Sequence, residues 1–228
     1  YRADPGIDAA VAKVMAGKPV YDFASADGVH HRLWVLPNDK SLALARQFDA
    51  AVGDLYVADG HHRSAAAARA HRELRGDGRE HDVFLAVVFP HDQMNILAYN
   101  RVVKDRQGRD GDAIIAALKE RMDVVSSDRK APEVRGSFGV YVGNGRWYQA
   151  TALPGSFDDG DPVGRLDCQI CQDQILAPVF GITDPRRDES IGFVGGIHGA
   201  AELERRVDSG AATVAFYLYP TAMDPVME

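Results

Sequence analysis

The sequence predicts an α+β protein with a mixed sheet flanked by helices. Short apolar runs with strand-like alternation are interspersed with stretches of helical periodicity, and several strand-like runs are joined by tight polar turns. Hairpins of this kind argue against a purely parallel sheet. With 228 residues, 46% of them apolar and 26% charged, the chain can bury one large core or two smaller ones.

Local signals define the elements expected in the first third of the chain. Asp4-Pro5 is a typical helix start, and Gly17-Lys18-Pro19 is a typical helix end. Residues 20–36 alternate as a hairpin does, with Asp27-Gly28 at its turn. A helix over 41–52, a strand over 55–58 and an alanine-rich helix over 64–75 follow.

Strands predominate in the remainder of the chain. Strand-like runs at 82–89, 95–103, 124–125, 137–142, 146–150, 191–196 and 213–219 alternate with helical patterns at 112–122, 166–177 and 200–208. Gly143-Asn144-Gly145 closes a hairpin, and Pro178 is expected to stop the helix before it. A Gly/Asp/Pro-rich loop over 154–164 separates a first region, 1–153, from a C-terminal α/β portion, 154–228.

Composition excludes several classes of protein. The net charge of −7 and the isoelectric point near 5.6 disfavour a nucleic-acid-binding surface, which requires a basic patch. No apolar run approaches the roughly 20 residues that span a bilayer, and no signal peptide is recognisable. Two cysteines are too few for a disulfide framework, so a cytoplasmic location is expected. The chain begins without methionine, as a piece of a longer protein would. The sequence predicts no particular oligomeric state.

The most informative motif is Asp59-Gly60-His61-His62-Arg63. It connects a predicted strand to a predicted helix through a glycine, which presents free backbone N–H groups and the positive end of the helix dipole. Two histidines and an arginine occupy the first turn, with no acid after Asp59. This arrangement favours a bound anion, most often a phosphate.

The spacing of the helix places Arg63 on the same stripe as Ala67, Ala70 and Leu74, the side expected to face the sheet. A buried arginine requires a carboxylate or a ligand oxygen as its partner. The alternative is purely structural: Asp59 caps the helix and Arg63 pairs with a carboxylate of the core.

Other candidates each have two interpretations. Asn100 and Arg101 end a strand-like run, where Arg101 either faces a nucleotide or belongs to an exposed strand end. Cys168-Gln169-Ile170-Cys171 is a single CxxC inside a predicted helix, so two buried thiols are favoured over a zinc or redox site. Asp167 is expected to cap that helix, and His71, His81 and His91 are expected in solvent.

Three segments resemble the signatures of the bacterial family called domain of unknown function 1015. They are Val57–Ser64, Tyr99–Val103 and Phe193–Gly196, and the stretch from Leu166-Asp167 through Pro178–Ile182 also fits. The resemblance covers the whole chain. Members of the family are larger and carry segments before and after the part represented by this sequence.

More distantly, the motif is similar to the turn of the ParB/sulfiredoxin superfamily, which includes free serine kinases, and this implies a ParB/sulfiredoxin-like core. The resemblance implies that Asp59 is a catalytic or metal-linked acid, that His62 and Arg63 contact phosphate, and that the backbone of Gly60 and His61 lies nearby. The general base proposed for the kinases matches no residue of this chain. Sulfiredoxin chemistry is excluded because His61 occupies its cysteine position.

The anion-binding turn and the resemblance together predict a nucleotide-dependent phosphotransferase acting on a small hydroxyl-bearing metabolite. The resemblance to free serine kinases makes free serine the leading candidate. ATP or ADP and Mg²⁺ are the expected cofactors. Asp59 and His62 are the predicted catalytic residues, and Asp59 is also the predicted metal ligand. The predicted nucleotide contacts are Gly60, His61, His62, Arg63, Ser64, Asn100 and Arg101. A non-catalytic nucleotide- or metabolite-binding regulator is the alternative, and the acidic charge disfavours a ParB-like DNA-binding protein.

Overall fold

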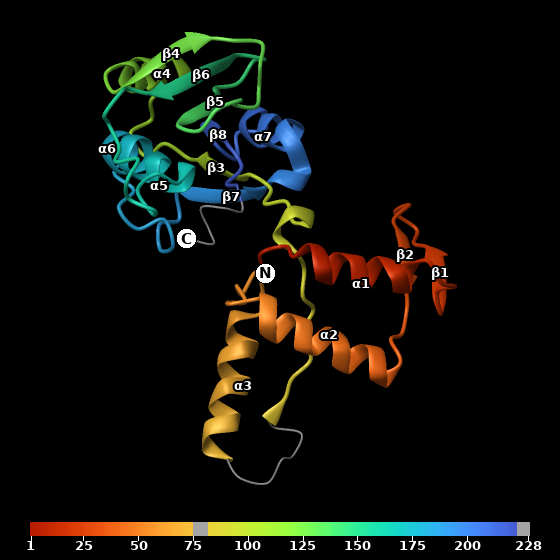
Figure 1. The fold of residues 1–228 in the computed structure, drawn as a ribbon. Coiled ribbons are helices and arrows are strands. Elements are labelled where there is room, and N and C mark those ends of the chain that lie inside the picture. The colour runs from red at the N-terminus through yellow and green to blue at the C-terminus, as the bar shows by residue number, and fades with distance from the viewer. Residues whose placement is uncertain (75–81, 223–228) are drawn as a thin grey trace. The chain divides into compact units, whose positions relative to one another are not determined.

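The structure is a computed structural model that describes residues 1–74 and 82–222. The chain forms two compact units, Tyr1–Met94 and Asn95–Glu228, each of which is described by itself (Figure 1). The boundary predicted after residue 153 therefore falls inside the second unit. Arg75, the predicted end of the alanine-rich helix, and His81, which was predicted to be in solvent, lie outside the described residues.

The first unit is mainly helical and confirms several predicted elements. Its elements are α1 (Pro5–Met15), β1 (Tyr21–Ala24), β2 (His30–Leu33), α2 (Asn38–Ala51), α3 (His61–Glu73) and the 3-10 turn η2 (His91–Gln93). The Asp4 carboxylate caps α1 by accepting hydrogen bonds from the backbone N–H groups of Gly6 and Ile7. Strands β1 and β2 form the expected antiparallel hairpin, in which Tyr21 lies opposite Leu33.

Two strands predicted in this unit are wrong. Residues 55–58 and 82–89 contain no strand, and the side chain of Leu85 is 94% exposed. Strand-like composition indicates only that the side chains of a segment suit a pleated, half-buried surface. A strand also needs a hydrogen-bonded neighbour, and β1 and β2 pair only with each other.

The second unit contains an antiparallel sheet of six strands in its described part, in the order β4-β6-β5-β8-β3-β7. The mixed α and β composition was predicted correctly, whereas the predicted mixed sheet is antiparallel at every described strand pair. The strands are β3 (Tyr99–Val103), β4 (Met122–Ser126), β5 (Ser137–Tyr141), β6 (Trp147–Ala152), β7 (Ile191–Gly195) and β8 (Val214–Leu218). The helical elements are α4 (Gly111–Lys119), α5 (Asp167–Cys171), the π-helical turn η3 (Gln172–Leu176), α6 (Ala177–Phe180), the 3-10 turn η4 (Gly196–His198) and α7 (Gly199–Asp208).

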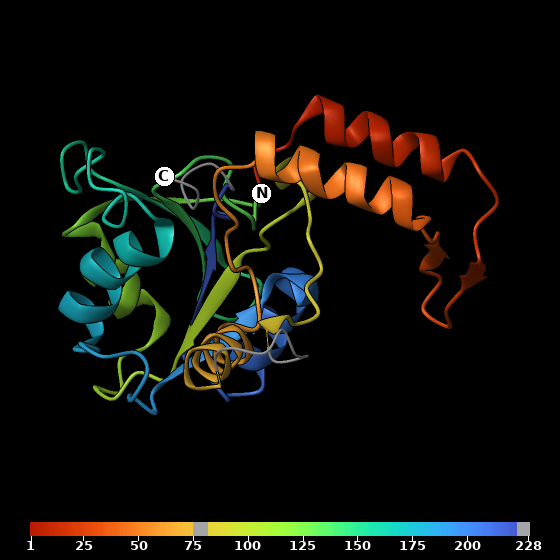
Figure 2. The same ribbon diagram turned by 60° about the horizontal axis from the view of Figure 1, so that its bottom comes forward.

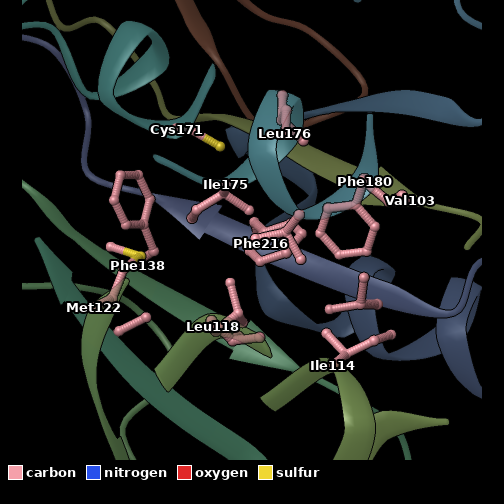
Figure 3. Packing of buried hydrophobic residues seen from close by; sticks show 14 of the residues in the cluster. Val103, Ile114, Leu118, Met122, Phe138, Cys171, Ile175, Leu176, Phe180 and Phe216 are labelled. Carbon is pink, nitrogen blue, oxygen red and sulfur yellow. The ribbon is translucent and has the colours of Figure 1, made fainter. Parts of the chain in front are cut away.

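The sheet separates two apolar layers, because successive residues of a strand point to opposite faces. Val103 packs into the larger layer, with side chains from α4, α5 and α6, whereas Val102 packs into the smaller layer with Leu203 and Val207 of α7. The turned view shows these helices on opposite sides of the sheet (Figure 2). In the larger layer, Phe216 of β8 lies among residues of all three helices (Figure 3).

The helix predicted over 166–177 does not stop before Pro178. Segments α5, η3 and α6 are continuous, and they end at Gly181, whose φ is +70°. Proline breaks a helix by removing an N–H from the i→i−4 pattern. Because the π turn Gln172–Leu176 already interrupts that pattern just before Pro178, the proline begins a new α-helical turn at little cost.

Candidate functional site

The predicted motif forms a tight turn at the start of α3. Gly60 has φ +80° and ψ +28°, a left-handed conformation that glycine adopts without strain. Helix α3 begins at His61, and the Ser64 N–H donates the first helical bond to the Gly60 carbonyl at 2.9 Å. No side chain caps the helix and its first turn contains no acid, so its first amides retain their capacity to bind an anion.

Arg63 does not lie on a buried face, as the helical spacing predicted. Its side chain is 81% exposed, and Nη2 donates to Oδ2 of Asp59 at 3.2 Å. Helix α3 has no buried residue, because a stripe of alanines offers little apolar surface to hold it against another layer. The carboxylate partner is therefore a surface acid rather than a core acid. An ion pair this exposed contributes about 0–1 kcal/mol, so a ligand can displace it readily.

The structure brings the six predicted residues Asp59–Ser64 together in one turn. Asp59, His61 and His62 are exposed, and Gly60 and Ser64 are half-buried. The Arg63 guanidinium folds back over the turn, since a Cβ added to Gly60 would lie 3.2 Å from its Nε. The turn thus combines uncapped amides with two imidazoles and a guanidinium on an accessible surface.

The other two predicted nucleotide contacts lie in the second unit. Asn100 and Arg101 are inside β3 and buried, which corrects the interpretation of an exposed strand end. Oδ1 of Asn100 accepts the Leu218 N–H at 3.0 Å, whereas its Nδ2 has no hydrogen-bond partner among the described residues. The predicted site residues therefore form two groups, one in each unit.

Arg101 is a buried cation with unusual surroundings. Its guanidinium lies 4.9 Å from the centre of the Tyr99 ring and 4.6 Å from that of Phe193, and it donates to the Tyr99 carbonyl. Within the described residues no carboxylate pairs with it. Burial lowers the pKa of the Arg101 guanidinium, and the thiols of Cys171 and Cys168 oppose that shift. Arg101 is thus held by rings and carbonyls and lies near two sulfur atoms.

Asp167 does not cap its helix, contrary to prediction. Its side chain is buried, and Oδ1 accepts the Gly136 N–H at 2.8 Å. Burial raises the pKa of the Asp167 carboxyl to about 6. The residue lines a cavity of about 160 Å³ together with Arg135 and Tyr219. Sequence reasoning missed this site because nothing in the local pattern distinguishes a buried acid from a capping one.

We expect Asp167 to make the protein less stable as the pH rises. Its folded pKa of about 6 exceeds the ordinary value of 3.8, so its contribution is complete below pH 4 and is lost as the pH passes 6. The loss amounts to about 3 kcal/mol at most. Urea unfolding of Asp167→Asn, which keeps an acceptor for Gly136, should show a stability gain over the unsubstituted protein that grows from pH 4 to pH 7. A constant difference across that range would contradict the assignment.

A larger open cavity of about 580 Å³ lies elsewhere in the second unit. Its lining includes Lys104, Asn144, Asp208 and Thr213. The Tyr141 hydroxyl donates to the Asp208 carboxylate at 2.9 Å, which fixes one wall. Sequence analysis identified Asn144 only as a hairpin residue, a role confirmed by its φ of +56°.

The histidines and acids form no metal centre in residues 1–74 and 82–222, where no three or more His, Cys, Asp or Glu side chains gather. His71 is exposed as predicted, with its ring 2.9 Å from Asp82. His91 is half-buried rather than exposed, and its Nδ1 accepts the Ala3 N–H. The predicted metal site therefore consists of a single protein ligand, Asp59. Over the same residues, no helix has the length and apolarity required to cross a membrane.

Comparison with known proteins identifies a family but no characterised relative. Neither the curated proteins nor the solved structures contain a match to this chain. The profile of the family described as protein of unknown function DUF1015 matches residues 1–169, a range that includes the Asp59–Ser64 turn, Asn100 and Arg101. Because the match covers well over half of the sequence, the chain belongs to the DUF1015 family.

Proposed function

We propose that this protein is a nucleotide-dependent phosphotransferase that acts on a small hydroxyl-bearing metabolite, as the ParB/sulfiredoxin-like free serine kinases do. The observation that carries the proposal is the uncapped start of α3 behind a left-handed Gly60, with histidines and an arginine where most helices place acids. Such a start suits the phosphates of ATP or ADP.

Each residue of the turn has a role in this proposal. The amides of His61 and His62 and the Arg63 guanidinium would hold phosphate oxygens, with the His62 imidazole and the Ser64 hydroxyl beside them. Phosphoryl transfer depends mainly on such positioning and on neutralisation of charge. Mg²⁺ binds nucleotide sites through one or two carboxylates together with phosphate oxygens, so the single acid Asp59 fits that ion, which would neutralise phosphate charge.

The Asp59–Arg63 ion pair links binding to chemistry. A phosphate that accepts a hydrogen bond from Arg63 competes for that guanidinium with the Asp59 carboxylate. Oδ2 of Asp59 lies 3.2 Å from Nη2 of Arg63. Binding would thereby free Asp59 to hold the metal ion or to accept the substrate hydroxyl proton. Asn100 and Arg101 are buried in β3, and the proposal does not require them.

One observation favours a second function, a non-catalytic regulator that binds a nucleotide or metabolite. The charged side chains of the motif are all exposed, and Asp59 forms an ion pair with Arg63. Catalytic acids and bases are commonly held in desolvated surroundings that shift their pKa toward neutrality. A surface phosphate cradle can bind without catalysing a reaction.

The test is to incubate the protein with labelled ATP or ADP, Mg²⁺ and a panel of amino acids with and without hydroxyl groups. The phosphotransferase predicts transfer of label to a hydroxyl-bearing compound and none to alanine or valine. Saturable nucleotide binding without transfer would replace the proposal with the regulator. Absence of both binding and transfer would overturn both functions.

A further inference from the structure

The two cysteines of the second unit differ sharply in their surroundings. Cys168 is exposed, whereas Cys171 is fully buried in the larger apolar layer, where its sulfur points into the core (Figure 3). The sequence predicted two buried thiols, and only Cys171 agrees. Exposure of one thiol beside a buried one is the asymmetry that a disulfide-exchange pair requires, since one sulfur must meet the reagent and the other must be protected from it.

The helix places the two residues at a separation that a disulfide can bridge. Both lie in α5, three positions apart. In a helix with a rise of 1.5 Å per residue and a Cα radius of about 2.3 Å, Cα atoms three residues apart are roughly 5 Å from each other. This value lies inside the window of about 4.4–6.8 Å found for disulfides, so the Cα separation permits a bond between them.

Arg101 supplies the positive charge that such a pair uses. Its guanidinium is buried against the Tyr99 and Phe193 rings, and both Cys171 and Cys168 interact with it electrostatically. No carboxylate in the described residues neutralises it. This charge lowers the pKa of the Cys171 thiol and so favours its thiolate, the form that attacks a disulfide.

We propose that Cys168 and Cys171 form a reversible dithiol–disulfide site that reacts with small-molecule disulfides such as oxidised glutathione. The Cys168 thiolate attacks one sulfur of the reagent, which forms a mixed disulfide and releases one glutathione thiolate. The Cys171 sulfur then attacks Cys168, its proton passing to solvent, and the second glutathione leaves. The two cysteines are oxidised by two electrons, and the reagent is reduced to two thiols. A dithiol reductant reverses both steps.

The burial of Cys171 sets the order of these steps. Burial raises the pKa of the Cys171 thiol to about 12, and the Arg101 charge only partly offsets that rise. Cys171 is therefore a poor nucleophile toward external reagents and acts only on the adjacent mixed disulfide. Cys168, on the exposed side of α5, is the sulfur that meets the reagent.

The experiment treats the reduced protein with oxidised glutathione, blocks remaining thiols with an alkylating agent and measures the intact mass. The proposal predicts an internal disulfide with no bound glutathione. Cys171→Ser should stop at the mixed disulfide, and Cys168→Ser should remain unmodified. Arg101→Met, in which a long apolar chain replaces the cation, should slow the second step about tenfold, so that the mixed disulfide accumulates.

Two results would overturn the site: an unsubstituted protein that stops at the mixed disulfide, as Cys171→Ser does, or one in which both thiols are still alkylated once the treated protein is denatured. Circular dichroism of each serine variant establishes that it is folded, so a failure to react is a property of the thiols. Neither outcome bears on the Asp59–Ser64 turn, which contains no cysteine.

Discussion

Replacing Gly139 with alanine is expected to destabilise the second unit strongly. Gly139 lies in β5, between Gln149 of β6 and Tyr217 of β8. An added Cβ would fall on the backbone carbonyl oxygen of Lys130 and 3.2 Å from the Cβ of Tyr217. Tyr217 belongs to β8 and the Lys130 oxygen is a backbone atom, so relief of the clash requires a backbone shift. We therefore expect a loss of about 3 kcal/mol in the free energy of unfolding.

The matched control is Gly195→Ala, at the end of β7 in the same sheet. A Cβ at Gly195 meets no atom closer than 4.0 Å, and the residue has an ordinary φ of −60°. Urea unfolding should therefore show a change within about 0.5 kcal/mol for the control. Equal losses in the two variants would mean that the segment around Lys130 does not cover β5.

Asp59→Asn is expected to abolish phosphoryl transfer while leaving nucleotide binding intact. Asparagine is nearly isosteric, but it can neither accept a proton nor supply the negative charge that a metal ion requires. Loss of an acid–base group of this kind typically lowers turnover by 10²–10⁴-fold, so we expect a decrease in kcat of at least about 100-fold. The Kd for nucleotide should stay unchanged or decrease, because the substitution also releases Arg63 from its ion pair.

The comparison is with Asp54→Asn, an exposed acid outside the motif. That variant should retain both turnover and affinity. If Asp59→Asn kept full turnover, Asp59 would have no chemical role. If it weakened binding as strongly as turnover, the carboxylate would serve only to hold the turn.

Local signals were sufficient for the elements whose stability is local. The Asp4 cap, the Asp27-Gly28 hairpin and the Gly143–Gly145 turn each follow from a few adjacent residues, and each appears in the structure. The antiparallel order of the six strands depends on contacts between distant segments, such as β3 with β8, and no local pattern encodes it. For the same reason the runs at 55–58 and 82–89 resemble strands in sequence but form none in the structure.

In the candidate site, too, features set by local sequence could be predicted and features set by distant contacts could not. The glycine turn and the uncapped helix start at Gly60 could be predicted, because both depend on the motif alone. The exposure of Arg63 could not, since helical spacing identifies a shared face but not whether anything covers it. Arg101 and the cysteine pair were likewise interpreted separately. They interact electrostatically although β3 and α5 are far apart in the chain, and no local pattern encodes that interaction.

The central claim is that the Asp59–Ser64 turn binds a phosphate, and a calorimetric titration with ADP tests it most directly. The unsubstituted protein, Arg63→Gln and Arg69→Gln should be compared at one salt concentration. Arg69 is the matched control because it is exposed on the same helix and pairs with Glu73. We expect saturable binding that Arg63→Gln weakens about tenfold, as loss of one charged hydrogen bond does, and that Arg69→Gln leaves unchanged. No saturable binding, or equal affinities in all three proteins, would contradict the claim.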